Sequence, residues 1–148
     1  MDEIAIFDID GTLADISGRQ HHVRTHPKNW KAFFEGMAED KAVASVVRLC
    51  NILYDAGVYI ILCSGRNEEH RPETIDWMAR MGVKYHEIRL RADGDMRSDV
   101  KAKREMLKGD RPEQNPLRRG GSRPRGGHVA VGRANLPAMR ARGFLTVC

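Results

Sequence analysis

A four-residue apolar run near the start of the chain stops abruptly at two acidic residues and a glycine. Residues 4–7 read Ile-Ala-Ile-Phe, and the polar stretch that follows contains Asp8, Asp10 and Gly11. A buried strand that ends in polar residues and glycine is typical of the carboxyl edge of a parallel sheet. Such a sheet needs long crossover connections, usually helices, so this feature favours an α/β fold. In extended chain, residues i and i+2 point the same way, so both carboxylates can face one site.

The rest of the chain alternates apolar strands with amphipathic helices. Residues 58–63 form a continuous apolar run between Gly57 and Ser64-Gly65, which predicts a strand buried on both faces. This order predicts a three-layer Rossmann-like α/β fold in one domain, residues 1–148, with the site at the carboxyl edge of a parallel sheet. The apolar spacing predicts helices over residues 27–37, 43–53, 72–81 and 98–107, and a short strand within 83–90.

Charge is distributed unevenly along the chain. The formal charge is +5, but residues 1–107 carry a net −2, and all of the positive excess lies in residues 108–148. This distribution excludes a basic nucleic-acid surface spread over the first three quarters of the chain. Residues 109–127 are mostly Gly, Pro and Arg, which predicts a flexible loop. Residues 128–148 then predict a degenerate last strand, over 128–131, and a short helix, over 136–142.

The same composition bears on the cellular compartment. No apolar run approaches the ~20 residues that a membrane span requires, so no membrane association is expected. The acidic N-terminus lacks the basic and then apolar build of a signal peptide. Three cysteines are too few for a disulfide framework and fit a reducing compartment. We therefore expect a cytoplasmic protein.

The chemistry of two close carboxylates limits what the first strand end can do. Two carboxylates this close need a cation, or one of them must hold a proton. Both conditions suit phosphoryl transfer, in which one Asp attacks phosphorus while the other moves a proton and Mg²⁺ offsets charge. A calcium loop is the first alternative, but its glycine would be sixth, whereas Gly11 is fourth from Asp8. The other alternative is a solvated turn after a strand.

Two further segments carry groups that suit a phosphate. Ser64 supplies a hydroxyl, Gly65 allows close backbone approach, and Arg66 offers a planar cation. Lys103, at the start of a predicted helix, could neutralise phosphate and carboxylate together. Cys63 ends the apolar run and is expected to be a core thiol rather than a nucleophile.

The order of these segments resembles a known superfamily. The stretch Phe7–Leu13, the stretch Leu62–Arg66 and then Lys103 resemble the haloacid dehalogenase (HAD) superfamily of aspartate-nucleophile phosphatases. The finer spacing, from Leu90-Arg91 through Arg97 and Asp99 to Lys103-Arg104-Glu105, is similar to the 3′-phosphatase domain of polynucleotide kinase–phosphatases. The resemblance runs over residues 3–107.

The resemblance implies a role for each matching residue. Asp8 would be the nucleophile and Asp10 the general acid–base, while Ser64 and Lys103 would hold the transferring phosphate. Mg²⁺ would be the cofactor, held by Asp8 and Asp10, the latter through its backbone carbonyl. The resemblance also implies a catalytic role for Lys103 beside the two aspartates. The other positions implied to support phosphate or substrate are Gly11, Thr12, Gly65, Arg66, Arg91, Arg97 and Asp99.

The resemblance also implies a substrate and bears on partners. The family substrate is a 3′-phosphate at a polynucleotide or nucleotide end. Residues 14–40 leave room only for a small cap, and an open site suits a polymer end. No Gly-x₄-Gly-Lys-Ser/Thr is present, so a kinase activity would require a separate partner. The oligomeric state is not predicted by the sequence.

One family feature is missing. The superfamily expects a last apolar strand ending in two acidic residues, but the matching stretch Ala130–Arg133 has Val131 and Gly132 at those positions. Three explanations stay open: a degenerate site, a reading-frame shift across residues 109–133, or replacement by water or a distant residue. The missing pair motivates one alternative to a 3′-phosphatase, an impaired module that binds phosphate or nucleic acid. The other alternative is a small-metabolite phosphatase of the same superfamily.

Three aromatic residues follow one another at helical spacing before residue 40. Trp30, Phe33 and Phe34 could form a base-stacking platform, but apolar residues at this spacing more often pack against a core. We therefore expect them to be packing residues.

Overall fold

The first strand lies at the centre of a five-stranded sheet whose neighbouring strands all run parallel. In this computed structural model, which describes residues 3–108, 130–131 and 144–147, the strand order is β5-β4-β1-β7-β6. The predicted parallel sheet is thus confirmed. Its strands are β1 (Ile4–Phe7), β4 (Tyr59–Asn67), β5 (Glu87–Arg91), β6 (Ala130–Val131) and β7 (Phe144–Val147).

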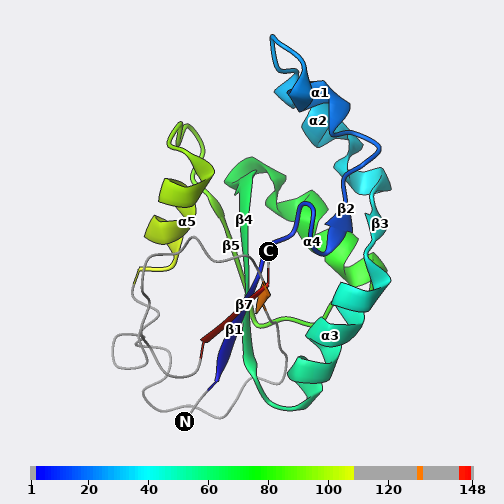
Figure 1. Ribbon diagram of the computed structural model, residues 1–148, viewed down its shortest axis with the longest axis vertical. Coiled ribbons are helices and arrows are strands. Elements are labelled where there is room, and N and C mark those ends of the chain that lie inside the picture. Colours follow the sequence, from blue (N-terminus) through cyan, green and yellow to red (C-terminus); the bar gives the residue numbers. More distant parts are fainter. Residues whose placement is uncertain (1–2, 109–129, 132–143, 148) are drawn as a thin grey trace.

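Helices cover both faces of this sheet. Helix α3 (Ala44–Asp55) precedes β4, and α4 (Arg71–Arg80) connects β4 to β5. Helix α5 (Asp99–Met106) follows β5. Figure 1 shows α3 and α4 on one side of the strands and α5 on the other. These elements confirm the predicted three-layer α/β fold and the predicted helices over residues 43–53, 72–81 and 98–107.

Strand β4 is longer than the sequence predicts. We expected it to end at Cys63 and to turn at Ser64-Gly65, but it continues through Asn67. Its pairing with β5 shifts register between Cys63 and Asn67, so the chain stays extended while the ladder is interrupted. Ser64 and Arg66 therefore belong to the strand itself, and a rigid element carries them at the edge of the sheet.

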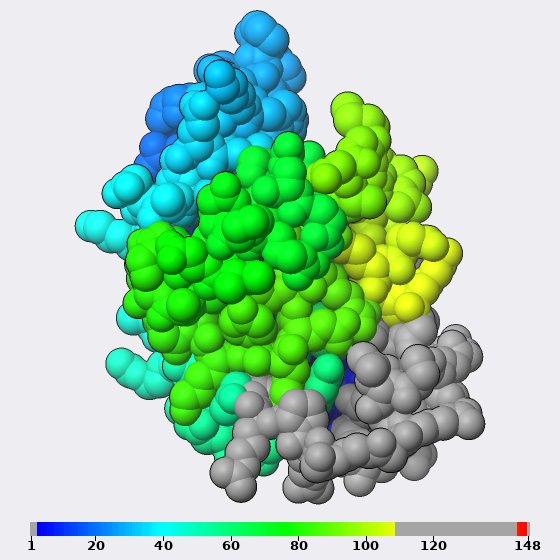
Figure 2. Space-filling model, turned by 180° about the vertical axis from the view of Figure 1, so that it is seen from behind, coloured from blue at the N-terminus to red at the C-terminus, as the bar shows by residue number. Residues whose placement is uncertain are grey.

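Residues 14–42 form the small cap that the sequence predicts. Strand β2 (Ala14–Asp15) pairs antiparallel with β3 (Lys41–Ala42), and this two-stranded ribbon supports the rest of the cap. In Figure 1 the cap rises beyond the carboxyl ends of the strands, and Figure 2 shows a notch between it and the yellow-green segment near α5. The other cap elements are α1 (His21–Arg24), α2 (Trp30–Glu35) and the 3₁₀ turn η1 (Gly36–Glu39).

The core lies between the central strands and the helices. All four residues of β1 are buried, and so are residues 60–64 of β4, against which Trp77 and Met78 of α4 pack. Burying one large apolar side chain is worth about 1.5–3 kcal/mol, so these strands are a firm base for the residues that follow them. Cys63 is buried in this core, and burial raises the pKa of its thiol to about 12. The expectation of a core thiol is therefore confirmed.

The C-terminal part differs from the prediction in one respect. Of the strand expected over 128–131, residues 130–131 form β6, and residues 128–129 lie outside the described residues. Strand β7 was not predicted, and it lies between β1 and β6. The predicted loop over 109–127, the predicted helix over 136–142, and Gly132 and Arg133 lie outside the described residues. No helix within the described residues is both long and apolar enough to cross a membrane.

Candidate active site

A tight turn after β1 presents both aspartates at the carboxyl edge of the sheet. The carbonyl of Ile9 accepts hydrogen bonds from the backbone N–H groups of Thr12 and Ala14, and Gly11 adopts a φ of 79°. A positive φ is accessible to glycine without a steric penalty, which explains glycine at this position. The backbone N–H of Asp8 donates to the carbonyl of Val147 at 3.0 Å, so the neighbouring strand β7 also fixes this turn.

Asp8 faces a lysine. Oδ2 of Asp8 lies 3.0 Å from Nζ of Lys103, and its Oδ1 accepts a hydrogen bond from the N–H of Ile9 at 2.8 Å. Nζ of Lys103 is also 2.9 Å from Oδ2 of Asp99, one turn earlier on α5. Burial raises the pKa of Asp8 above its ordinary value, and Lys103 offsets this only in part. Burial alone would lower the pKa of Lys103, but Asp8 and Asp99 outweigh it and raise that pKa.

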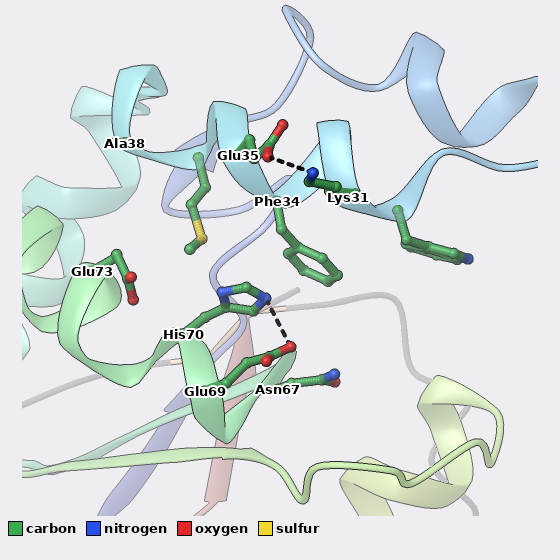
Figure 3. A pocket seen from close by; sticks show the side chains of 10 residues that line it. Lys31, Phe34, Glu35, Ala38, Asn67, Glu69, His70 and Glu73 are labelled. Atoms are coloured by element: carbon green, nitrogen blue, oxygen red, sulfur yellow. Dashed lines mark ion pairs between the residues drawn. The ribbon is translucent and has the colours of Figure 1, made fainter.

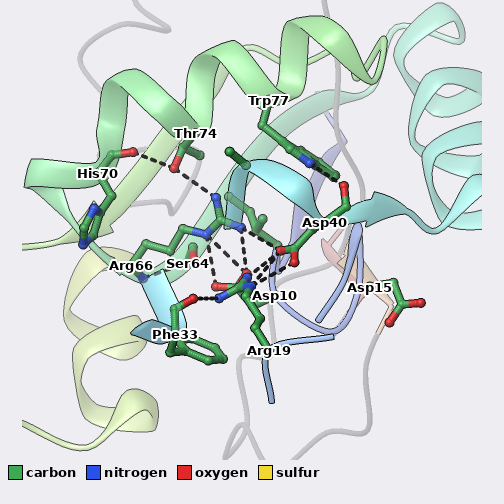
Figure 4. Close-up of polar contacts among 12 residues, drawn as sticks. Asp10, Asp15, Arg19, Phe33, Asp40, Ser64, Arg66, His70, Thr74 and Trp77 are labelled. Carbon is green, nitrogen blue, oxygen red and sulfur yellow. Dashed lines mark hydrogen bonds and ion pairs between the residues drawn. The ribbon is translucent and has the colours of Figure 1, made fainter. Parts of the chain in front are cut away.

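Asp10 is held between two buried arginines. Nη2 of Arg66 donates to Oδ1 of Asp10 at 2.7 Å, and Nε of Arg66 donates to Oδ2 at 3.1 Å. Nη2 of Arg19 donates to the same Oδ1 at 2.5 Å (Figure 4). Burial alone would raise the pKa of Asp10, but Arg66 and Arg19 outweigh it and hold the pKa below its ordinary value. Asp10 is therefore ionised in this arrangement, although it lies only two residues from a carboxyl group with the opposite shift.

A third carboxylate completes the network. Asp40 accepts hydrogen bonds from Nε and Nη2 of Arg19, the shorter at 2.6 Å, and its Oδ2 lies 3.9 Å from Nη2 of Arg66. Nη1 of Arg19 donates to the carbonyl of Phe33, and the indole N–H of Trp77 donates to the carbonyl of Asp40. The cap is thereby tied to the reaction centre through side chains that are almost fully buried.

The sequence pattern does not indicate that Arg19 and Asp40 belong to the site. Both belong to the cap, and as single charged residues between short elements they are typical of solvated positions. Their burial follows from the pairing of β2 with β3, which brings Arg19 and Asp40 together. The residues next to Arg19 are Gly18 and Gln20, so no apolar pattern in the sequence distinguishes it from the exposed Arg24.

The residues predicted on β4 lie close to this network. Ser64 is fully buried, and its Oγ accepts a hydrogen bond from the backbone N–H of Arg66 at 3.2 Å. Gly65 faces the Asp99 carboxylate so closely that an added Cβ would collide with it. Nη2 of Arg91 lies 3.3 Å from Oδ1 of Asp99, which places Arg91 beside the Asp99–Lys103 pair. The structure thus gathers the three motif segments at one edge.

Two predicted substrate positions lie differently. Thr12 is buried in the turn after β1. Arg97 points its guanidinium toward the Asp95 carboxylate, at 2.8 and 2.9 Å, and contributes its backbone carbonyl to Arg91 at 2.6 Å. Within the described residues, no contact joins the Arg97 guanidinium to Asp8. Its predicted role toward phosphate stays a prediction, as do the roles of the other residues.

The oxygen ligands at this site suit an open magnesium site better than a site in which protein side chains enclose the metal ion. The described residues contain no group of three or more His, Cys, Asp or Glu that could enclose a metal ion. Mg²⁺ usually keeps several waters and takes one or two carboxylates together with substrate phosphates, so a single carboxylate at Asp8 fits it. The Asp10 carboxylate is engaged by two guanidinium groups, which is compatible with the backbone carbonyl of Asp10 being the ligand that the resemblance implies beside Asp8.

Comparison with solved structures finds related folds. One chain from a structure described as the Pnkp1/Rnl/Hen1 complex is 26% identical, with a TM-score of 0.59 over 72% of this chain and 34% of that chain. A chain of the Pnkp1/Rnl/Hen1 RNA repair complex is 26% identical, with a TM-score of 0.58 over 71% of this chain and 31% of that one. The chain therefore spans about a third of the length of these neighbours.

A class C acid phosphatase from Bacillus anthracis, solved with tungstate bound, shares the fold. It is 23% identical, with a TM-score of 0.56 over 72% of this chain and 47% of that chain. No match to this sequence is found among curated proteins. The sequence does match the family described as the polynucleotide kinase PNKP phosphatase domain over residues 2–111, a range that includes Asp8, Ser64 and Lys103. The chain therefore belongs to the family of polynucleotide kinase phosphatase domains.

Proposed function

We propose that the chain hydrolyses phosphomonoesters through an aspartyl-phosphate on Asp8, with 3′-phosphorylated nucleic-acid or nucleotide ends as the substrate. The observation that carries this proposal is the opposite environment of two carboxylates two residues apart. Asp8 lies 3.0 Å from a lysine, whereas Asp10 is held by two arginines. Such pairs, whose environments push their pKa values apart, are typical of sites that divide nucleophilic and acid–base work.

In the first step an Asp8 oxygen attacks phosphorus, and the bond from phosphorus to the ester oxygen breaks. The leaving alcohol takes a proton from Asp10, and the phosphoryl group stays on Asp8. In the second step water attacks phosphorus, Asp10 accepts its proton, and the bond to Asp8 breaks to release inorganic phosphate. Bound Mg²⁺ would offset the charge of the phosphate oxygens.

Arg66 has to change partners during this cycle. In the structure Asp10 is ionised by its two arginines, a state suited to accepting a proton from water rather than to giving one. A phosphate dianion is a strong bidentate partner for guanidinium and would compete with Asp10 for Arg66. Such competition would weaken the hold on Asp10 and raise its pKa when the substrate binds, which supports its use as the acid in the first step.

The substrate class rests on the family and on the small cap. Two of the solved structures that this chain resembles are described as Pnkp1/Rnl/Hen1 complexes, one of them as an RNA repair complex, so both RNA and DNA ends belong in the test. A separate kinase partner, Mg²⁺ dependence and the 3′-end preference are parts of this proposal. The small-metabolite phosphatase and the impaired binding module remain the competing hypotheses.

One assay separates these hypotheses. The protein is incubated with Mg²⁺ and with 3′-phosphorylated DNA and RNA oligonucleotides, 5′-phosphorylated oligonucleotides and sugar phosphates, and released phosphate is measured. The control is Asp8→Asn, which keeps the shape of the side chain but removes the nucleophile. We expect release from 3′ ends by the wild type and none by Asp8→Asn.

Each other outcome has a meaning. Release from sugar phosphates alone contradicts the nucleic-acid substrate and favours the small-metabolite alternative. Binding of oligonucleotides with no release from any substrate contradicts the enzyme and favours the impaired module. Loss of release on adding a chelator, with recovery on adding Mg²⁺, tests the cofactor.

A further inference from the structure

A pocket beside the reaction centre is lined by aromatic rings. Its volume is about 540 Å³, and it lies between α2 of the cap and the segment from Asn67 to Glu73, which includes the 3₁₀ turn η2 (Glu68–His70) (Figure 3). The Phe34 ring stacks on the His70 ring at 4.6 Å between centroids, and the Trp30 ring is nearly parallel to Phe34 at 6.1 Å.

These rings are not simply packing residues. We expected Trp30, Phe33 and Phe34 all to pack, and Phe33 does so, with 6% of its surface exposed. Trp30 keeps 50% of its surface exposed at the pocket. An indole that is left half exposed beside stacked rings is a surface on which another flat ring can stack.

The walls of the pocket are joined to the groups that hold Asp10. Asn67 directly follows Arg66, and Phe34 directly follows Phe33, whose carbonyl accepts a hydrogen bond from Arg19. Arg66 also donates to Oγ1 of Thr74, which in turn donates to the carbonyl of His70 at 2.7 Å. A molecule in this pocket is therefore next to the residues that position the acid–base carboxylate.

The charge of the pocket selects against further phosphates. Three carboxylates line it, from Glu35, Glu69 and Glu73, and Lys31 is the lysine among the lining residues. Lys31 lies 3.8 Å from Glu35, so its charge is already matched in part. An acidic wall repels a phosphodiester backbone, but it accepts hydrogen bonds from the N–H groups of an uncharged base.

We infer that this pocket binds the nucleobase of the terminal nucleotide whose 3′-phosphate is removed at Asp8. The inference rests on the proposed function and goes beyond it, because it assigns the base to Trp30, Phe34 and His70. The Asn67 side chain, which has no hydrogen-bond partner within the described residues, offers an amide to the edge of the base.

The test compares a normal 3′-phosphorylated end with an end that lacks only the terminal base. For the wild type we expect kcat/KM to be higher for the base-bearing end, by roughly 5- to 100-fold, as stacking on an aromatic side chain gives. In Trp30→Ala this ratio should fall toward one. The matched control is Ile52→Ala, which removes an apolar side chain of similar exposure from α3 and should leave the ratio unchanged.

A binding measurement makes this test independent of turnover. The chain has two tryptophans, and Trp77 is buried, so Trp30 reports on the pocket. In Asp8→Asn protein, a nucleoside 3′-monophosphate should quench tryptophan fluorescence, whereas ribose phosphate should not. The added Trp30→Leu substitution should abolish the quenching.

The outcomes distinguish the two proposals. Release of phosphate from 3′ ends at equal rates with and without the base, and with no quenching, overturns the pocket but leaves the phosphatase standing. Base-dependent quenching of Trp30 without phosphate release from any end supports the pocket and overturns the proposed activity. Quenching that persists in Trp30→Leu overturns the assignment to this pocket.

Discussion

Nζ of Lys103 lies between two carboxylates, 3.0 Å from Oδ2 of Asp8 and 2.9 Å from Oδ2 of Asp99. Among the residues that the structure describes, Lys103 is the cation that forms an ion pair with Asp8, whose pKa burial raises above the ordinary value. A nucleophilic carboxylate has to be ionised, so the contact with Lys103 opposes an effect that would otherwise keep Asp8 protonated. Asp99 in turn holds the ammonium group in place.

Replacing this lysine should change the pH profile as well as the rate. In Lys103→Met the offset to burial is lost, so the pKa of Asp8 rises further. The acid limb of kcat/KM should therefore move to higher pH, and kcat should fall by roughly 10²- to 10³-fold, as when one donor to a reacting oxyanion is removed. Steady-state kinetics over a pH range measures both effects.

A lysine on the same helix provides the control. Lys101 is exposed on α5 and contacts neither aspartate within the described residues, so Lys101→Met should keep the wild-type profile. If Lys103→Met lost activity while the acid limb stayed in place, Lys103 would act only by binding the phosphate. The proposed effect of Lys103 on the ionisation of Asp8 would then be wrong.

A side chain at Gly65 should displace the Asp99 carboxylate. A Cβ at this position collides with the Asp99 carboxylate and lies 3.5 Å from Nη2 of Arg91. Gly65→Ala should therefore push Asp99 away from Lys103 and lower kcat/KM. Because the clash requires both groups, adding Gly65→Ala to an Asp99→Ala protein should cost much less than adding it to the wild type.

The control for this cycle is Gly18→Ala. A Cβ at Gly18 meets no atom within 4 Å, and its backbone does not have a positive φ, so kinetics should be unchanged. Additive losses from Gly65→Ala and Asp99→Ala would contradict the collision as the cause.

The sequence predicts the sheet, because its strands are apolar runs that end in polar residues or glycine. The run at residues 4–7 and the one at 58–63 both form central strands, and Gly57 and Gly82 end helices with φ values of 88° and 68°. Strand β7 was missed because it depends on pairing with β1, which is a contact between distant parts of the chain.

The candidate site likewise contains residues that the sequence indicates and residues that only tertiary contacts bring into it. Residue type and spacing pointed to Asp8 and Asp10, and the resemblance of the whole pattern pointed to Lys103. The structure places Lys103 against Asp8, while the chemical roles of all three stay predictions. Arg19 and Asp40 were not found, because a charged residue in a short cap segment is typical of the surface until folding pairs it with another. The exposure of Trp30 likewise depends on where α2 lies against the segment around His70, which helical spacing alone does not specify.

Arg19 should resist even its most similar replacement. Its guanidinium donates to Asp10, Asp40 and the carbonyl of Phe33, and an ammonium group cannot reach all three. Arg19→Lys should lower the free energy of unfolding by about 3 kcal/mol, the low end of the cost of breaking a buried ion pair. Urea denaturation measures this loss.

The loss should be concentrated in the cap. Hydrogen exchange should accelerate over residues 14–42 more than over β4, because Arg19 ties the cap to the sheet. The control is Arg48→Lys, an exposed arginine on α3, which should change neither measurement. Uniform acceleration across the chain would show that Arg19 stabilises the whole fold rather than the attachment of the cap.

The two aspartates should respond in opposite directions to the same substitution. Asp8 has a raised folded pKa, so its charge destabilises the fold as pH rises through that value, and Asp8→Asn should increase the free energy of unfolding at pH 7.

Asp10 has a lowered folded pKa, so it stabilises the fold above its unfolded pKa, near 3.8, and this stability is lost as pH falls through the folded value. Asp10→Asn leaves Arg19 and Arg66 with less negative charge to pair, and should decrease the free energy of unfolding by about 3 kcal/mol at pH 7. Urea denaturation of both variants at pH 7 and pH 4 tests the pair, and the difference between them should shrink at the lower pH, because less of the wild-type Asp8 is ionised there. Equal changes of the same sign would show that the two carboxylates share one environment, contrary to the contacts that separate them.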